Sequence, residues 1–284
     1  MSAPASSAPP AAVRIAAGSP AAAGHRAAVR AALPAPGSAT GPSPAYAFVL
    51  AHPLAERTVA ALTADASGPV TLVHLGQDIA LSGPLPSSGE LDATVSVRGT
   101  RPEARGTRVA LRTTLTAGEP GRVVAELTTH VLLAGADGAD ATGTVLPQAA
   151  PPLAEKGDRF ALTVPVTREW IAGYAAASGD HNPIHLDPGA ARAAGFPDVI
   201  AHGMSLVALA SEVAADALAG GEVSRVRALG ARFARPVSPG EELTVELTPG
   251  RSGSTVHFTC RTAAGSAVKG GWLRLDTAPE GSHG

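Results

Sequence analysis

Residues 178–204 read SGDHNPIHLDPGAARAAGFPDVIAHGM, and this stretch combines an acid and a base with a stiff framework of Pro and Gly. Asp180 and His185 are five residues apart, so a continuous helix would place their side chains about 140° apart. Asn182-Pro183 predicts a non-helical bend, because Pro fixes its own φ and biases the preceding residue away from the α region. The bend allows both side chains to reach one water, one group taking a proton while the other delivers one.

Gly203 directly precedes a stretch, Met204 to Leu218, that is predicted to be a long helix. Its N–H would then be one of the unpaired donors at a helix N-terminus, which can stabilise a developing oxyanion by about 3 kcal/mol. Each feature also has an ordinary interpretation: Asp caps turns, a lone His is commonly a surface residue, and Gly often begins a helix. The combination within one stretch favours an active site.

Outside this stretch the chain reads as two similar halves, each with a helix before a run of alternating strands. In the first half the helix spans 53–64 and the strands 70–81, 91–97, 107–115 and 123–133. In the second half a strand at 159–166 and a helix at 167–177 precede the motif, and after the helix at 204–218 the strands span 223–236, 241–247, 255–261 and 267–275. The turn at 84–91 resembles that at 236–243; coincidence is the alternative to an internal duplication. We predict an α+β protein made of two units, each a long helix against an antiparallel sheet.

Composition suggests where these units begin and end. Residues 1–44 are rich in Ala, Pro, Ser and Gly and are expected to form a disordered tail, although 21–33 has the propensity of a helix. The first unit is placed at 45–134 and the second at 157–277. A Gly-, Ala-, Asp- and Pro-rich linker at 135–156 separates them, and 278–284 is a short tail.

The overall composition narrows the classes of partner. A formal net charge of -2, with nine His, argues against nucleic-acid binding, which needs a clustered excess of Lys and Arg. There is no apolar run of eighteen residues and no signal-peptide pattern, so we expect a cytoplasmic protein without a membrane partner. Cys260, the single cysteine, alternates within a predicted strand and is interpreted as a structural thiol. No closed zinc-site spacing or Gly-rich dinucleotide loop is present, so neither a metal nor a cofactor is expected.

A resemblance covers the motif stretch and its surroundings. It rests on Tyr174, Ser178 to His185, Ala191, Gly195-Phe196, Ile200 and His202-Gly203-Met204. Together these residues resemble the signature of the MaoC-like, (R)-specific enoyl-CoA hydratase (hydratase 2) family, and residues 233–243 continue the likeness. The first half is similar, more weakly, to the degenerate half of double-hotdog hydratases and lacks a motif of its own.

The resemblance implies a double hotdog fold, in which curved antiparallel sheets wrap long central helices. It implies that Asp180 and His185 hold a water that adds syn to a trans-2-enoyl thioester, giving the (3R)-hydroxyacyl product, or that they catalyse the reverse dehydration. Gly203 would donate its N–H to the thioester oxygen. Asn182, His202 and Ser211 would shape the substrate site.

An acyl-CoA or acyl-carrier-protein thioester is therefore the expected substrate, in fatty acid metabolism, with the first half shaping an acyl tunnel. The chain could be a monomer or a homodimer of double units, since two fused halves already supply the pairing that single units obtain by dimerising. Two alternatives stay open. The first is an acyl-CoA thioesterase, because hotdog folds also include such enzymes. The second is a non-catalytic subunit that binds acyl thioesters.

Overall fold

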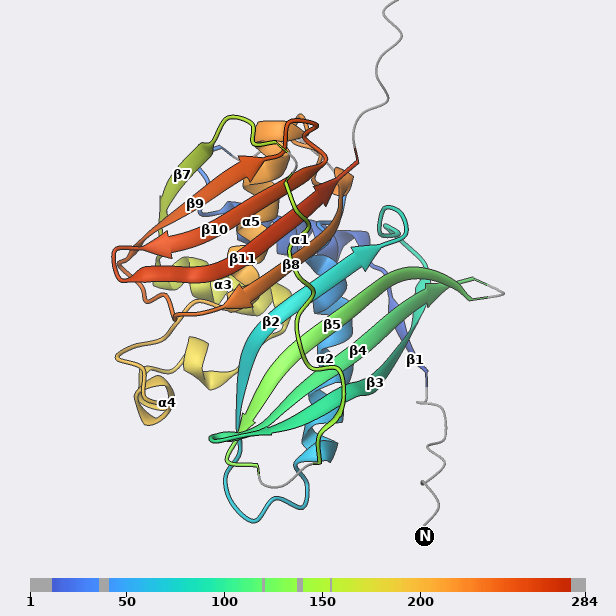
Figure 1. The fold of residues 1–284 in the computed structure, drawn as a ribbon, viewed down its shortest axis with the longest axis vertical. Helices are drawn as coiled ribbons and strands as arrows, with labels where there is room; N and C mark the ends of the chain where they lie inside the picture. The colour runs from blue at the N-terminus through green and yellow to red at the C-terminus, as the bar shows by residue number, and fades with distance from the viewer. Residues whose placement is uncertain (1–11, 36–40, 119–120, 137–139, 154, 277–284) are drawn as a thin grey trace, which may run out of the picture.

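The computed structural model describes residues 12–35, 41–118, 121–136, 140–153 and 155–276 (Figure 1). Most of its strands join into one antiparallel sheet, in the order β1-β3-β4-β5-β2-β8-β11-β10-β9-β7. The first part of the chain supplies β1 (Val13–Ala16), α1 (Ser19–Arg30), α2 (Tyr46–Leu62), β2 (Thr71–Leu81), β3 (Glu90–Glu103), β4 (Gly106–Ala117), β5 (Arg122–Ala134) and β6 (Thr142–Gly143). The second supplies β7 (Phe160–Pro165), α3 (Arg168–Ser178), η1 (Pro183–His185), α4 (Pro188–Ala193), α5 (Gly203–Leu218), η2 (Val223–Arg225), β8 (Val226–Phe233), β9 (Glu242–Pro249), β10 (Thr255–Thr262) and β11 (Gly265–Leu275).

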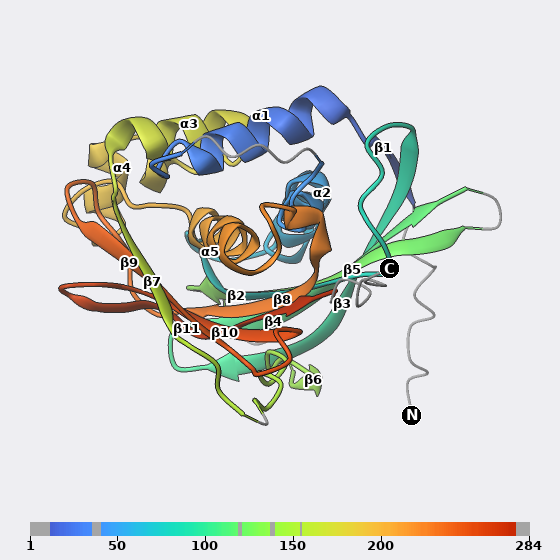
Figure 2. The ribbon, with the colours of Figure 1, turned by 90° about the horizontal axis from the view of Figure 1, so that it is seen from above.

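The two halves meet where β2 pairs with β8, from Gly76 opposite Arg232 to Ala80 opposite Ala228. Seen from above, the curved sheet lies on one side, α2 and α5 lie side by side on its concave face, and α1 and α3 form an outer layer over them (Figure 2). Two long helices packed on antiparallel strands are what the sequence predicted. The α+β double arrangement is therefore confirmed.

Helix α5 is the centre of the second unit because it can be buried on every side. All residues from Met204 to Ala215 are buried, and small Ala side chains at 208, 210, 214 and 215 let neighbouring elements approach closely. A helix that is apolar all round belongs in a core rather than at a surface. Its first residue, Gly203, is thereby held at a fixed place against the sheet.

Helix α2 begins earlier than the sequence predicted. We expected it to start near Pro53, whereas it begins at Tyr46 and carries Pro53 in its interior. An interior Pro costs about 3 kcal/mol through a lost hydrogen bond and a clash. Tyr46, Phe48 and Ala51 are all buried in the first turns, and this burial offsets the cost.

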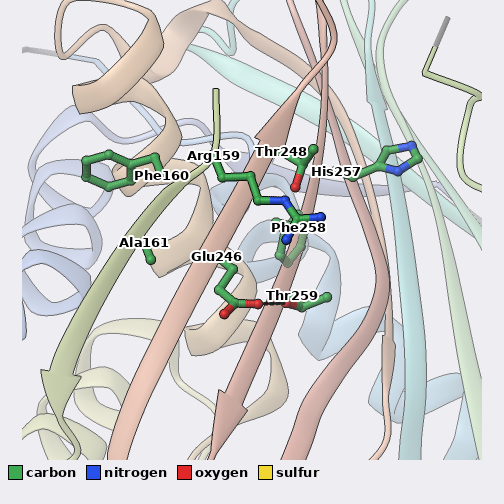
Figure 3. Close-up of a pocket in the computed structure, with 8 residues that line it drawn as sticks. All are labelled: Arg159, Phe160, Ala161, Glu246, Thr248, His257, Phe258 and Thr259. Atoms are coloured by element: carbon green, nitrogen blue, oxygen red, sulfur yellow. Dashed lines mark hydrogen bonds between the residues drawn. The ribbon is translucent and has the colours of Figure 1, made fainter. Parts of the chain in front are cut away.

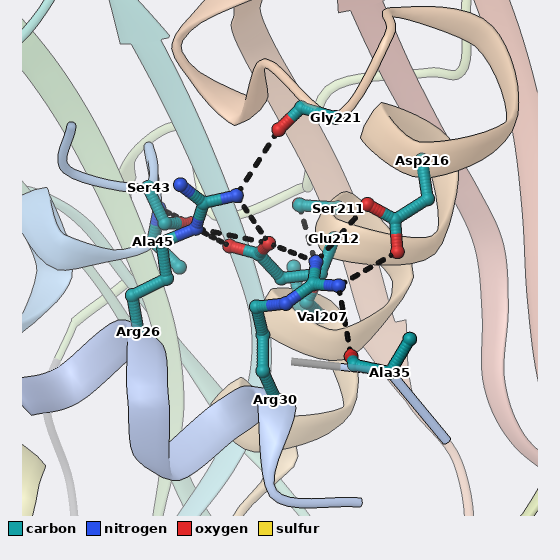
Figure 4. A network of polar contacts seen from close by, with 10 residues as sticks. All are labelled: Arg26, Arg30, Ala35, Ser43, Ala45, Val207, Ser211, Glu212, Asp216 and Gly221. Carbon is teal, nitrogen blue, oxygen red and sulfur yellow. Dashed lines mark hydrogen bonds and ion pairs between the residues drawn. The ribbon is translucent and has the colours of Figure 1, made fainter. Parts of the chain in front are cut away.

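The expectation of a disordered tail over residues 1–44 is wrong for residues 12–35. Strand β1 pairs with β3, and α1 packs against α3 and α5. Two arginines of α1 reach a carboxylate on α5 that is completely buried, at Glu212 (Figure 4). Arg26 Nε lies 2.9 Å from Glu212 Oε1, and Arg30 Nη1 lies 2.8 Å from Glu212 Oε2. The arginines and Glu212 are so distant in sequence that composition alone could not reveal their pairing. Residues 1–11, 36–40 and 277–284 of the two predicted tails lie outside the described residues.

Residues 140–153, within the predicted linker, run along the face of the sheet opposite the helices (Figure 2). Strand β6 pairs with β3, and the N–H of Gln148 donates to Asp78 Oδ2 on β2 at 3.0 Å. Farther on, Nε2 of His257 on β10 donates to the carbonyl of Pro151 at 2.6 Å. The segment therefore contacts strands of both halves.

Among the described residues, no helix is both long and apolar enough to cross a membrane.

Candidate active site

The motif loop begins at the left-handed end of α3. Thr167 caps the start of that helix by accepting the N–H of Trp170 at 3.1 Å. Gly179 ends it with φ 74°, a conformation that Gly adopts without a Cβ penalty. The chain therefore reverses directly before Asp180, which turns away from the helix.

Two short side-chain turns then shape the loop. Asp180 Oδ1 accepts the N–H of Asn182 at 3.2 Å, and Asn182 Oδ1 accepts the N–H of Ile184 at 3.3 Å. Asn182 has ψ 124° and is followed by the single 3₁₀ turn η1, which ends at His185. The predicted bend at Asn182-Pro183 is present. Asn182 serves it as a cap, so the structure gives this residue a role in shaping the loop.

Asp180, His185 and His202 come together at one place, with one polar atom of each within 4.8 Å of the others. The Nδ1 of His185 donates to the carbonyl of Ile200 at 2.7 Å, since a carbonyl can only accept. The Nε2 of a neutral His185 is then left with its lone pair. His202 Nε2 donates to the carbonyl of Asp180 at 3.0 Å, which joins the start of α5 to the motif loop.

Burial and neighbouring charges set the protonation of these groups. Burial lowers the pKa of His185 below its usual value, and burial together with His185 lowers the pKa of His202 to about 4. Burial raises the pKa of the Asp180 carboxyl, but the surrounding imidazoles outweigh it and hold that pKa below its usual value. These imidazoles belong to His202, His52 and His185. At neutral pH the site therefore holds the Asp180 carboxylate and the neutral imidazoles of His185 and His202.

A carboxylate beside two imidazoles is also a donor set that divalent transition metals accept. In this structure the rings of His185 and His202 stack, with centroids 3.7 Å apart and planes 28° apart. Nδ1 of His185 and Nε2 of His202 each donate to a backbone carbonyl, which leaves one nitrogen of each ring for a further partner.

Gly203 is the first residue of α5, and His202 is its N-cap. No acceptor within the described part of the chain takes the Gly203 N–H. A Cβ added at Gly203 would lie 2.7 Å from Cε1 of Phe233, closer than side chains normally approach. Glycine thus lets the helix start lie directly against that ring, and its amide stays available as a donor beside the Asp180 loop.

Ser211 does not join this cluster. It lies eight residues beyond Gly203 on α5, about 12 Å along the helix axis. Its hydroxyl donates to the carbonyl of Val207 at 3.0 Å and is fully buried. The structure therefore places its hydroxyl in the core, bonded within its own helix and next to Glu212.

Sequence reasoning missed the side chains that the first half brings to the site. His52 of α2 places its Nε2 3.8 Å from Asp180 Oδ1. His74 of β2 has its ring 4.8 Å from that of Phe233 and 5.5 Å from that of Phe48, centroid to centroid. Neither His lies in a motif. They could have been predicted only from the expectation that the two central helices pack side by side.

A hollow of about 330 Å³ lies elsewhere, on strands β7, β9 and β10 (Figure 3). It is lined by Arg159, Phe160, Ala161, Glu246, Thr248, His257, Phe258 and Thr259. His257 contacts the segment that runs along the face opposite the helices, so this hollow opens away from Asp180. None of the predicted site residues borders it.

Comparison with known proteins gives independent information on the chain. The MaoC like domain family matches residues 151–265, which include the whole motif stretch. The chain is 35% identical over 190 residues to 3-hydroxyacyl-thioester dehydratase Y of Mycobacterium tuberculosis. That alignment covers 65% of this chain and 65% of the relative, so the chain spans slightly less than two thirds of the relative's length.

Solved structures extend the likeness over the first half. The chain resembles a MaoC-like dehydratase from Phytophthora capsici with a TM-score of 0.73, at 20% identity, over 95% of this chain and 97% of that one. It also resembles a Mycobacterium tuberculosis protein described as a double hotdog fold, with a TM-score of 0.56 at 15% identity. That match covers 94% of this chain and 95% of the other. At these identities the comparison establishes the fold, and the double hotdog prediction is confirmed.

Proposed function

Because this chain belongs to the MaoC-like dehydratase family, we propose that it hydrates trans-2-enoyl thioesters to (3R)-hydroxyacyl thioesters and catalyses the reverse dehydration. The observation that carries the proposal is the meeting of Asp180 and His185 beside the N-terminus of α5. Adding water to a conjugated thioester needs a base for the water and a donor for the carbonyl oxygen. Both are available at this place.

In the proposed hydration, one water lies between Asp180 and His185. The Asp180 carboxylate accepts a hydrogen bond from the water and orients it, and His185 Nε2 takes the other proton. The hydroxide oxygen bonds to C3 of the enoyl group, and the electron pair of the double bond moves towards the thioester carbonyl. His185 then returns the proton to C2 on the same face, which gives syn addition and leaves both groups as they began.

Gly203 completes the reaction by holding the charge that reaches the thioester oxygen. Its free N–H lies at the N-terminal end of α5, where the helix dipole also favours negative charge. One such donor contributes about 3 kcal/mol to acyl chemistry. His202 supports this geometry, because its bond to the Asp180 carbonyl ties the helix start to the motif loop.

The substrate follows from the same chemistry. The thioester carbonyl must meet Gly203 while C3 faces the water. We propose an acyl thioester of CoA or of a carrier protein as the substrate, and no step requires a redox cofactor. A cytoplasmic location and a homodimer stay predictions.

The test is a panel of enoyl-CoAs from four to sixteen carbons, followed by the loss of the enoyl absorbance. We expect hydration, with (3R)-hydroxyacyl-CoA as the product on chiral analysis. A thiol reagent in parallel distinguishes hydration from hydrolysis. Release of free CoA would identify a thioesterase, whereas binding without turnover would identify an acyl-thioester binding subunit.

A further inference from the structure

His52 belongs to the first half of the chain, yet its imidazole lies against the motif loop of the second. It is on α2, and its Nε2 is 3.8 Å from Asp180 Oδ1 and 3.4 Å from Oε1 of Glu56, one turn further along the same helix. The His52 side chain is 15% exposed and that of Asp180 is 18% exposed. Within the described chain, the buried Nε2 atom of His52 has no hydrogen-bond partner.

We infer that His52 is a positioning residue for the reaction, through which the first half holds the Asp180 carboxylate and its water in place. The inference rests on the proposed function and extends it. The half without a motif would then do more than cover the acyl chain: it would supply part of the polar environment of the reacting water.

The distance between His52 and Asp180 fits a bridging water. A separation of 3.8 Å is longer than a direct hydrogen bond, but a single water can lie within about 2.8 Å of both His52 Nε2 and Asp180 Oδ1. A buried imidazole nitrogen without a hydrogen-bond partner is unfavourable, so this position favours a water or a substrate atom that bonds it. The hydration proposal likewise places its water at the Asp180 carboxylate.

Packing restricts the orientation of the His52 ring. It lies 5.2 Å from the ring of Phe48, centroid to centroid, and Phe48 stacks in turn on His74. His74 contacts Phe233, the residue against which Gly203 packs. One row of rings thus joins α2 and β2 to both ends of the site, the carboxylate and the backbone donor.

The charges around His52 also favour this role. His52 faces two carboxylates, Asp180 and Glu56, and the titratable groups beyond them are the imidazoles of His74, His185 and His202. A donor or positive charge at His52 favours the ionised form of Asp180. His52 is among the groups that hold the pKa of Asp180 below its usual value, against the effect of burial.

The experiment compares His52→Phe with His52→Gln. Phenylalanine keeps the ring contact with Phe48 and removes the nitrogen, whereas glutamine keeps a polar end and removes the ring. We expect His52→Phe to lower kcat for crotonyl-CoA roughly tenfold to a hundredfold with a smaller change in KM. His52→Gln should lose less.

His257→Gln is the matched control, since it removes an imidazole from the opposite face of the sheet. It should keep the wild-type kcat and KM, and thermal melting checks that each variant folds. A His52→Phe enzyme that folds and keeps the kcat of the wild type overturns the inference and leaves the hydratase proposal standing. A wild-type protein without hydratase activity overturns both.

Discussion

The imidazole of His185 stacks on that of His202, with ring centroids 3.7 Å apart. Two positive charges cannot be held at this separation in a buried site, so at least one ring must stay neutral. Burial already lowers the pKa of both. Burial keeps His185 in the form that can take a proton from water, while His202 fixes the loop that carries Asp180.

Acid should destabilise the fold before it protonates the carboxylates. Burial lowers the pKa of His25, His74 and His202 to about 4 in the folded chain, whereas an unfolded His titrates near 6.5. Between these values the unfolded state binds more protons, so stability is lost as pH falls from about 6.5 to about 4. Each His contributes on the order of a few kcal/mol to this loss. Thermal melting across this range checks the prediction.

His25→Phe isolates one of these groups. The ring of His25 lies against Tyr46 and Tyr174, and neither of its nitrogens has a partner among the described residues. Phenylalanine keeps the ring contacts and cannot titrate. We expect a smaller drop in melting temperature between pH 6.5 and 4 than in the wild type; an equal drop would mean that His25 is not buried as a neutral ring.

Gly203→Ala should reduce kcat although the backbone N–H is retained. The new methyl would lie 2.7 Å from the ring of Phe233, so either the ring or the start of α5 must move. A shift of about 1 Å in a donor costs roughly a hundredfold in rate. Adding Phe233→Leu should restore part of the activity by making room. If the losses of activity from Gly203→Ala and from Phe233→Leu simply add in the double variant, steric displacement is not the cause.

Glu212→Gln should destabilise the protein by about 3–5 kcal/mol, because Arg26 and Arg30 would keep their buried positions without that charge. Asp216→Asn is the control: this carboxylate also contacts Arg30, but its side chain is 42% exposed, and its removal should cost at most about 1 kcal/mol. Denaturant unfolding measures both. Equal effects would contradict a role for Glu212 in holding α1.

The sequence predicted the features that repeat or that use local chemistry. Alternating strands and two helices gave the double architecture, and Asn182-Pro183 gave the bend that turns Asp180 and His185 towards each other. It could not predict features that depend on contacts between distant segments. Helix α1 is held by Glu212, which is 186 residues from Arg26. Likewise, His52 reaches Asp180 only because the two central helices pack side by side.

The position of Ser211 in the sequence did not predict what its side chain contacts. Its place on α5 suggested a side chain facing the site, but its hydroxyl bonds the Val207 carbonyl, four residues earlier on the same helix. Ser211→Ala should therefore change kcat by less than about threefold, since this local bond contributes only about 1 kcal/mol to stability and touches no reacting group. Steady-state kinetics of the variant tests this, and a large loss confined to kcat would place Ser211 at the substrate.

The proposed hydration depends on one water shared by a carboxylate and an imidazole. Its most direct test is the rate of crotonyl-CoA hydration by the wild type, by Asp180→Asn and by His185→Ala, each checked for folding by thermal melting. We predict that each variant folds and loses roughly two to four orders of magnitude in kcat. Turnover close to that of the wild type in either variant would contradict the central claim.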